Sequence, residues 1–318
     1  MTRYKPTELK IEANNKKLDR LLFKVGLTGV KYGTDFESDI HFKNVPHYKA
    51  VVNLDEGSLL SIVTSNYHLL SNKDALAMGK AALVELFPEN KIVKEDIVPF
   101  SVWHNQKRTA CNIDLIYKTD GFLDFKKETW LPFVRVINSY NKQYRLQFQI
   151  GFVKSLCSNK IIFEGKTISY SYAHSKGRIP TKLIVRKELF QKQMSEFLVF
   201  LENFDKYNVK SKNVIPHVYR ALSIKASDFK DKDKEKVFNN TITGIWDHYS
   251  KDDNYTAHAL FNVLTDLTSN FELGNMTGIV RYESAIYNAS LVSNWVKSFA
   301  NEILKRDYHE DKYLGLNN

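Results

Sequence analysis

Lysine, arginine and aromatic side chains are interleaved in one part of the chain, residues 135–187. This basic segment contains eleven Lys and Arg residues and one acidic residue, Glu164, so its formal charge equals the +10 of the whole 318-residue chain. Seven Tyr and Phe residues lie among these cations. Proteins that hold single-stranded nucleic acid combine a cationic groove along the phosphates with aromatic faces on which bases stack. The basic segment therefore predicts a surface that binds a polyanion.

The predicted contacts are the side chains of this segment that we expect outside the hydrophobic core. Alternate residues of a strand face the core, so Phe148, Phe152 and Phe163 are expected to pack inside. Ser175-Lys176-Gly177-Arg178 is a short basic turn whose glycine allows the backbone to approach a phosphate. The predicted nucleic-acid-binding residues are Lys142, Tyr144, Arg145, Lys154, Lys166, Tyr170, Tyr172, Lys176, Arg178 and Lys182.

Signatures of catalysis are sparse. The nine histidines form no HExxH or His-x-His pattern, so zinc catalysis has no support. His68, His104 and His174 lie near predicted strand ends. Each is either a general acid/base group or a structural or surface histidine. Asp35, Glu37 and Asp39 alternate, so they form either a metal-binding strand face or a solvated acidic loop. We predict no catalytic residue, cofactor or metal, and the residues favour a binding protein over an enzyme.

The surrounding pattern predicts an α+β fold. Gly165-Lys166-Thr167 is expected in a hairpin turn, since a phosphate-binding loop needs an upstream glycine and a following helix. Predicted strands cover residues 48–54, 59–64, 97–103, 109–118, 130–140 and 144–150, with a hairpin of 161–163 and 167–173. One early helix, 72–87, begins at a capping box, and later helices cover 187–207, 216–226, 232–249, 256–269 and 284–304. The chain divides into a weakly patterned segment (1–45), a strand-rich, largely antiparallel α+β domain (46–186) and a helical region (187–318).

Four segments resemble the phage- and plasmid-associated family known as domain of unknown function 932: residues 48–57, 65–75, 152–159 and 259–266. In that family an aromatic-Val-Arg-x-x-Cys-x-Asn motif ends a central strand and an Asn-x-x-Thr-Glu motif lies on a late helix. Here Lys154 stands where arginine is usual, and Asp266 replaces the glutamate. The resemblance implies a phage or mobile-element setting and no biochemical mechanism.

The composition indicates the cellular compartment in which we expect the protein. Apolar residues make up 43% of the chain, yet no stretch approaches the roughly 18 that a membrane-spanning helix needs. The polar N-terminus lacks the apolar region of a signal peptide. Cys111 and Cys157 are expected to be buried, inert thiols in a reducing compartment. We therefore expect a protein of the cytoplasm, that of the host cell if a phage encodes it, with no membrane partner.

Three functional hypotheses follow. The first is a nucleic-acid-binding protein of a phage or mobile element, which binds or anneals single-stranded DNA in recombination or replication. The alternative is a host-directed or anti-defence protein whose cationic sheet binds an acidic protein surface. The third is a metal-dependent enzyme acting on nucleic acid through Asp35, Glu37 and Asp39. A homo-oligomer and a host protein remain open as partners.

Overall fold

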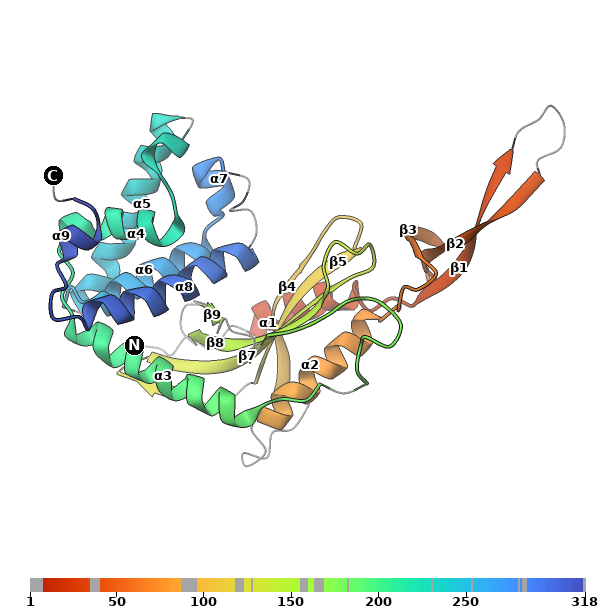
Figure 1. Ribbon diagram of the computed structural model, residues 1–318, viewed down its shortest axis with the longest axis horizontal. Helices are drawn as coiled ribbons and strands as arrows, with labels where there is room; N and C mark the ends of the chain where they lie inside the picture. The colour runs from red at the N-terminus through yellow and green to blue at the C-terminus, as the bar shows by residue number, and fades with distance from the viewer. Residues whose placement is uncertain are drawn as a thin grey trace.

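The computed structural model describes residues 8–34, 41–86, 96–117, 123–126, 128–154, 160–162, 169–181, 183–229, 231–252, 254–279, 281 and 285–316. Antiparallel sheets and two helices, one of them the predicted early helix, occupy the N-terminal and central parts, and helices follow to the C-terminal end, which confirms the α+β prediction. Figure 1 shows the helical region at one end of the molecule and a long β-hairpin projecting from the other.

The projecting hairpin belongs to a three-stranded sheet in the order β1-β2-β3, with helix α1 (Glu8–Asp19) preceding it. Its strands are β1 (Val25–Thr34), β2 (His41–Asn53) and β3 (Ser58–Thr64). The turn between β2 and β3 is the predicted one, and Gly57 adopts a positive φ of 68° there. Sequence patterning does not predict β1, because glycines at positions 26, 29 and 33 weaken its strand signal. Pairing with β2 along most of its length holds β1 in the sheet.

The central sheet has seven strands in the order β10-β8-β7-β5-β4, with β6 paired to β7 and β9 paired to β8. The strands are β4 (Ile97–His104), β5 (Ala110–Tyr117), β6 (Leu123–Phe125), β7 (Glu128–Ser139), β8 (Leu146–Lys154), β9 (Lys160–Ile162) and β10 (Ser169–Tyr172).

The predicted hairpin of residues 161–163 and 167–173 is wrong. Both β9 and β10 pair antiparallel with β8: Ile162 lies opposite Gly151, and Tyr170 lies opposite Phe148. Because β7 occupies one edge of β8, the two short strands lie one after the other along the opposite edge. The turn residues predict that the chain reverses and that the two short strands pair with each other. Each short strand pairs with β8 instead, because β8 is longer and offers more backbone for pairing.

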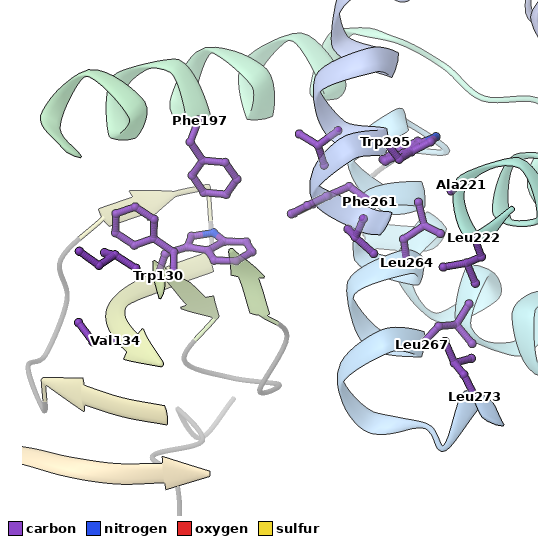
Figure 2. Packing of buried hydrophobic residues seen from close by; sticks show 14 of the residues in the cluster. Trp130, Val134, Phe197, Ala221, Leu222, Phe261, Leu264, Leu267, Leu273 and Trp295 are labelled. Carbon is purple, nitrogen blue, oxygen red and sulfur yellow. The ribbon is translucent and has the colours of Figure 1, made fainter. Parts of the chain in front are cut away.

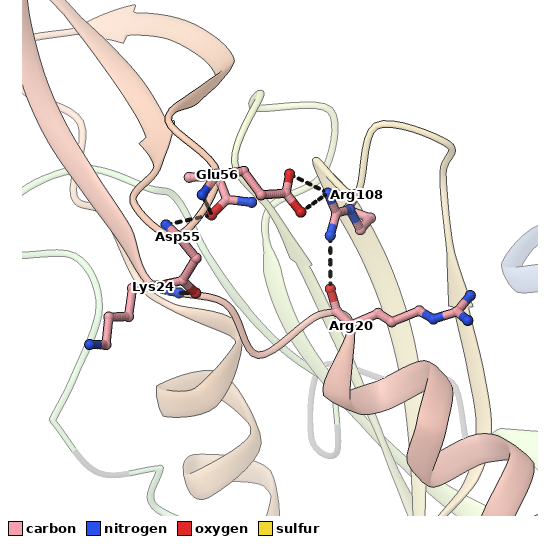
Figure 3. Close-up of polar contacts among 6 residues, drawn as sticks. Arg20, Lys24, Asp55, Glu56 and Arg108 are labelled. Atoms are coloured by element: carbon pink, nitrogen blue, oxygen red, sulfur yellow. Dashed lines mark hydrogen bonds and ion pairs between the residues drawn. The ribbon is translucent and has the colours of Figure 1, made fainter.

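A polar cluster ties the three-stranded sheet to the central sheet (Figure 3). Arg108, in the β4–β5 turn, donates through Nη2 to both carboxylate oxygens of Glu56 at 2.8 and 2.6 Å. Its Nη1 also donates to the carbonyl of Arg20, after α1, at 3.5 Å. The Lys24 N–H donates to Asp55 Oδ2 at 2.9 Å. The β2–β3 turn is thereby held against both α1 and the central sheet.

Helix α2 (Asn72–Leu86) packs directly on β7. The predicted N-cap is present, since Ser71 Oγ accepts from the Asp74 N–H at 3.0 Å. The Asn72 N–H donates to the buried Tyr140 hydroxyl at 2.9 Å. The helix approaches so closely that a Cβ added at Gly79 would lie 2.5 Å from Val136 Cγ2. Any larger residue at this position would have to push the Val136 side chain aside.

The C-terminal region consists mostly of the predicted helices, and no helix among the described residues is long and apolar enough to cross a membrane. Two short helices, α7 and α9, were not predicted. The helices are α3 (Lys187–Lys206), α4 (Val214–Leu222), α5 (Lys232–Asp252), α6 (Ala257–Asn270), α7 (Leu273–Thr277), α8 (Ala285–Ile303) and α9 (Glu310–Tyr313), with single 3₁₀ turns at Ser211–Asn213 and Ala226–Asp228.

Sheet and helices share one hydrophobic core (Figure 2). The Trp130 ring, from β7, lies 5.3 Å from that of Phe197 on α3 and 5.9 Å from that of Phe261 on α6. Phe152 on β8 stacks on Phe197 at 5.9 Å. All four side chains are buried, so one face of β7 and β8 is covered by helices. Phe148 is buried on this same face, as predicted.

Candidate nucleic-acid interface

A cleft of about 440 Å³ opens beside the Leu146 end of strand β8, where three parts of the chain meet. They are the end of β3 with the residues after it, the β7–β8 turn, and the segment that follows β10. The lining residues are Thr64, Asn66, Lys142, Tyr144, Arg145, Ala173, His174 and Ser175. The structure therefore brings three of the predicted binding residues into one concave site.

The β7–β8 turn holds its cations in a defined position. Ser139 Oγ accepts from the Tyr144 N–H at 3.0 Å and donates to the Tyr144 carbonyl at 2.7 Å. Asn141 Nδ2 donates to Thr109 Oγ1 at 3.1 Å, which ties the turn to that between β4 and β5. Lys142 has a φ of 63°, a left-handed conformation that favours glycine, and its Nζ donates to Thr64 Oγ1 at 3.2 Å. A left-handed backbone at a residue other than glycine costs free energy, and such positions cluster at functional sites.

The other wall is a pair of segments joined by their backbones. The His68 N–H donates to the His174 carbonyl at 3.2 Å, and the Lys176 N–H donates to the Asn66 carbonyl at 3.1 Å. Between them Tyr67 forms an antiparallel bridge with Ser175. These bonds hold the residues after β10 against those after β3, so the wall is part of the folded core of the chain.

The cleft is cationic. Lys142 and Arg145 are exposed at its lining, and no acidic side chain lines it among the residues that the structure describes. Lys176 and Arg178 are exposed in the turn immediately after Ser175, where Gly177 has the positive φ of 73° that this turn requires. Neither lines the cleft, but both extend its positive charge along the surface.

His174 is the deepest titratable side chain of the cleft. It is 9% exposed, and its ring stacks on that of Tyr67 at a centroid distance of 5.2 Å. Burial lowers the pKa of His174, the backbone of the nearby His68 acts in the opposite sense, and the charge of the His68 side chain lowers the pKa further. The imidazole is therefore neutral near pH 7. His104 is tied to its neighbour, with Nδ1 2.9 Å from the Asn105 carbonyl.

The structure does not place Lys154 on this surface, which corrects its prediction as a binding residue. It lies at the opposite end of β8 and is 5% exposed. Its Nζ donates to Asn262 Oδ1 on α6 at 3.3 Å and lies 5.4 Å from the Tyr249 ring centre on α5. This hydrogen bond joins described residues of two of the segments quoted for the family resemblance, 152–154 and 259–266.

Tyr170 and Tyr172 are also poorly placed for stacking on a base. They lie opposite Phe148 and Leu146 across the β8–β10 pair and, half-buried, pack against the same core. The Tyr170 hydroxyl accepts from the Arg186 N–H at 3.3 Å, and burial raises the pKa of Tyr172. Arg135, counted in the basic segment, is buried too and binds Asp114 on β5 at 2.7 Å.

Several predicted residues lie outside the described part of the chain. Lys166 and Lys182 are among them, as are Asp35, Glu37 and Asp39 and the thiol of Cys157. Within the described ranges, no group of three or more His, Cys, Asp and Glu side chains is arranged to hold a metal ion. Cys111 is buried, and burial raises the pKa of its thiol to about 12, consistent with an inert role.

Sequence patterning missed the β3 side of the cleft, Thr64 and Asn66. Both are small, uncharged residues, and only the fold brings them beside a turn almost 80 positions away. No known protein family, curated protein or solved structure matches the chain. The resemblance to domain of unknown function 932 therefore remains an expectation from the sequence, and the cleft is interpreted from its own geometry.

Proposed function

We propose that the protein binds single-stranded DNA through the cleft at the Leu146 end of β8. One observation carries the proposal: Lys142, Tyr144 and Arg145 line the same cleft, and its described lining contains no acidic residue. Two cations suit adjacent phosphates, and the half-buried Tyr144 offers a ring on which a base stacks. The exposed Lys176 and Arg178 continue the path of the phosphates.

The biological setting that we propose is recombination or replication of a phage or mobile element. This part rests on the four resembling segments together with the binding cleft. Binding through phosphates suits a protein that holds or anneals DNA strands of any sequence, because phosphate contacts carry no base information. An acidic host protein would bind the same cations, so the experiment must separate the two ligands.

The test is a titration of labelled single-stranded DNA by fluorescence anisotropy between about 50 and 300 mM salt, a range over which binding through phosphate contacts weakens steeply. We expect the Lys142→Gln/Arg145→Gln variant to bind about a hundredfold more weakly at low salt, roughly tenfold for each phosphate that is no longer neutralised. Its salt slope should fall by about 1.4, since each neutralised phosphate of a single strand contributes about 0.7.

The matched control is Lys232→Gln/Lys236→Gln, which removes the same charge from the exposed side of α5. It should bind DNA as the wild type does, because those lysines lie far along the chain and outside the cleft lining. Equal losses in both variants would mean that net charge, and no particular site, attracts DNA. No binding at low salt, or binding indifferent to salt, would refute the proposal and favour an acidic protein ligand.

A further inference from the structure

We propose that the cleft accommodates one unpaired nucleotide, with Lys142 and Arg145 at the two phosphates that flank it and His174 hydrogen-bonded to its base. The inference rests on the proposed binding of single-stranded DNA and adds a residue that contacts the base. The cleft volume of about 440 Å³ lies at the lower end of pockets that enclose small ligands, about 300–1,000 Å³. A site of this size suits one nucleotide better than a length of strand.

The state of His174 points to a missing hydrogen-bonding partner. Its side chain is more than nine-tenths buried at the cleft lining, yet neither Nδ1 nor Nε2 has a hydrogen-bond partner in the described part of the protein. Buried polar atoms are almost always paired, because leaving one unpaired costs stability. Stacking on Tyr67 holds the ring, so its nitrogens are preorganised for a ligand.

The hydrogen-bonding groups of the His174 imidazole indicate which part of a nucleotide it would contact. A neutral imidazole has one N–H donor and one acceptor nitrogen, the pair of functions that a base edge also presents. A phosphate offers only acceptors and is better met by the exposed cations Lys142 and Arg145. His68, half-buried on the adjoining segment, is the other titratable group that acts on His174. The cleft thus has a cationic rim and a neutral, hydrogen-bonding interior.

The critical variant is His174→Phe, which keeps an aromatic ring against Tyr67 and removes both nitrogens. Its affinity is compared with that of the wild type for a short oligothymidylate and for an abasic oligonucleotide of the same length. We expect His174→Phe to bind the base-bearing strand about five- to tenfold more weakly, the loss of one hydrogen bond to a buried group. Affinity for the abasic strand should be unchanged, because the cations remain.

Two outcomes would overturn the inference alone: equal affinities of wild type and His174→Phe for the base-bearing strand, or equal losses for both strands. The first means that His174 does not contact the base, and the second that it only supports the fold. If the wild type binds neither strand in a salt-dependent manner, the proposed function fails as well, so the two failures are distinguishable.

A measurement on the wild type alone covers the case in which His174→Phe does not fold. Burial lowers the pKa of His174 from its ordinary value, so its ring is neutral at pH 7.5. At that pH we expect the ring nitrogen resonances of His174 in the NMR spectrum to shift when the oligothymidylate is added and to stay unchanged when the abasic strand is added. Resonances that do not move with the base-bearing strand, or that move equally with both strands, would contradict the inference.

Discussion

The two ends of strand β8 have the same charge and opposite surroundings. Arg145, just before the strand, is exposed at an open cleft, whereas Lys154, its last residue, is 5% exposed beneath α5 and α6. Lys154 has Asn262 and the Tyr249 ring as neighbours. Removing a lysine from water is costly unless its hydrogen bonds are replaced. One cation is therefore committed to the fold, and the other is available to a ligand.

This difference limits what a count of charges reveals. The basic segment has +10 in its sequence, but at least two of its cations, Arg135 and Lys154, are buried and paired within the fold. The charge that the folded protein exposes is therefore smaller than the count implies. Among the described residues, four exposed cations lie at the Leu146 end of β8, in the cleft and in the turn that contains Lys176 and Arg178, and Arg186 is exposed at the start of α3.

The largest effect that we predict is on stability, at the buried end. Lys154→Glu should lower the free energy of unfolding by at least about 3 kcal/mol, because it places a carboxylate in a site built around a cation. Lys154→Met, which keeps the length of the side chain without the charge, should cost only about 1–2 kcal/mol. Guanidinium-induced unfolding followed by circular dichroism measures both values.

The Lys154→Met variant also tests the difference between the two ends of β8. Folded Lys154→Met should bind single-stranded DNA as tightly as the wild type, with an unchanged salt slope. A loss as large as that of Lys142→Gln/Arg145→Gln would show that the buried end of β8 also contacts DNA, and the distinction between the two ends would fail.

Much of the fold could be predicted from local pattern. The alternation of Leu146, Phe148 and Ile150 identified β8, and Ser71 with Asp74 identified the start of α2. The same alternation, continued two steps further, places Lys154 on the inward face with Phe152, a signal that its charge obscured. What covers that face was not predictable, because Asn262 lies 108 positions away on α6.

The sequence was sufficient to predict which cations line the candidate site, but it was not sufficient to predict the shape of the cleft. Lys142, Tyr144 and Arg145 lie within four positions of the sequence, so charge and composition identified them together. The opposite wall depends on the bridge between Tyr67 and Ser175, a contact between residues more than a hundred positions apart. Strand β1, which is rich in glycine, depends likewise on its pairing with β2, and β9 and β10 depend on their pairing with β8; no local pattern reveals these partner strands.

The next effect in size separates the aromatic residues of the basic segment. Tyr144→Ala should weaken binding of single-stranded DNA by about 1–3 kcal/mol, the usual value of a base stacked on an aromatic ring. Tyr144→Phe should retain the affinity, since the ring is kept. Tyr170→Ala, at the core side of β10, should instead lower thermal stability and leave the affinity unchanged. Equal losses of affinity for Tyr144→Ala and Tyr170→Ala would contradict this assignment.

The smallest effect concerns the backbone of Lys142 and sharpens the contrast between stability and binding. Its φ of 63° suits glycine better than lysine, so Lys142→Gly should raise the free energy of unfolding by about 0.5–1 kcal/mol even though it removes the hydrogen bond to Thr64. Its affinity for single-stranded DNA at low salt should fall about tenfold, the value of one neutralised phosphate. Thermal unfolding and anisotropy measure the two changes. A variant less stable than the wild type would mean that Lys142 serves the fold, whereas higher stability with weaker binding would show that this lysine is kept at the turn for its ligand.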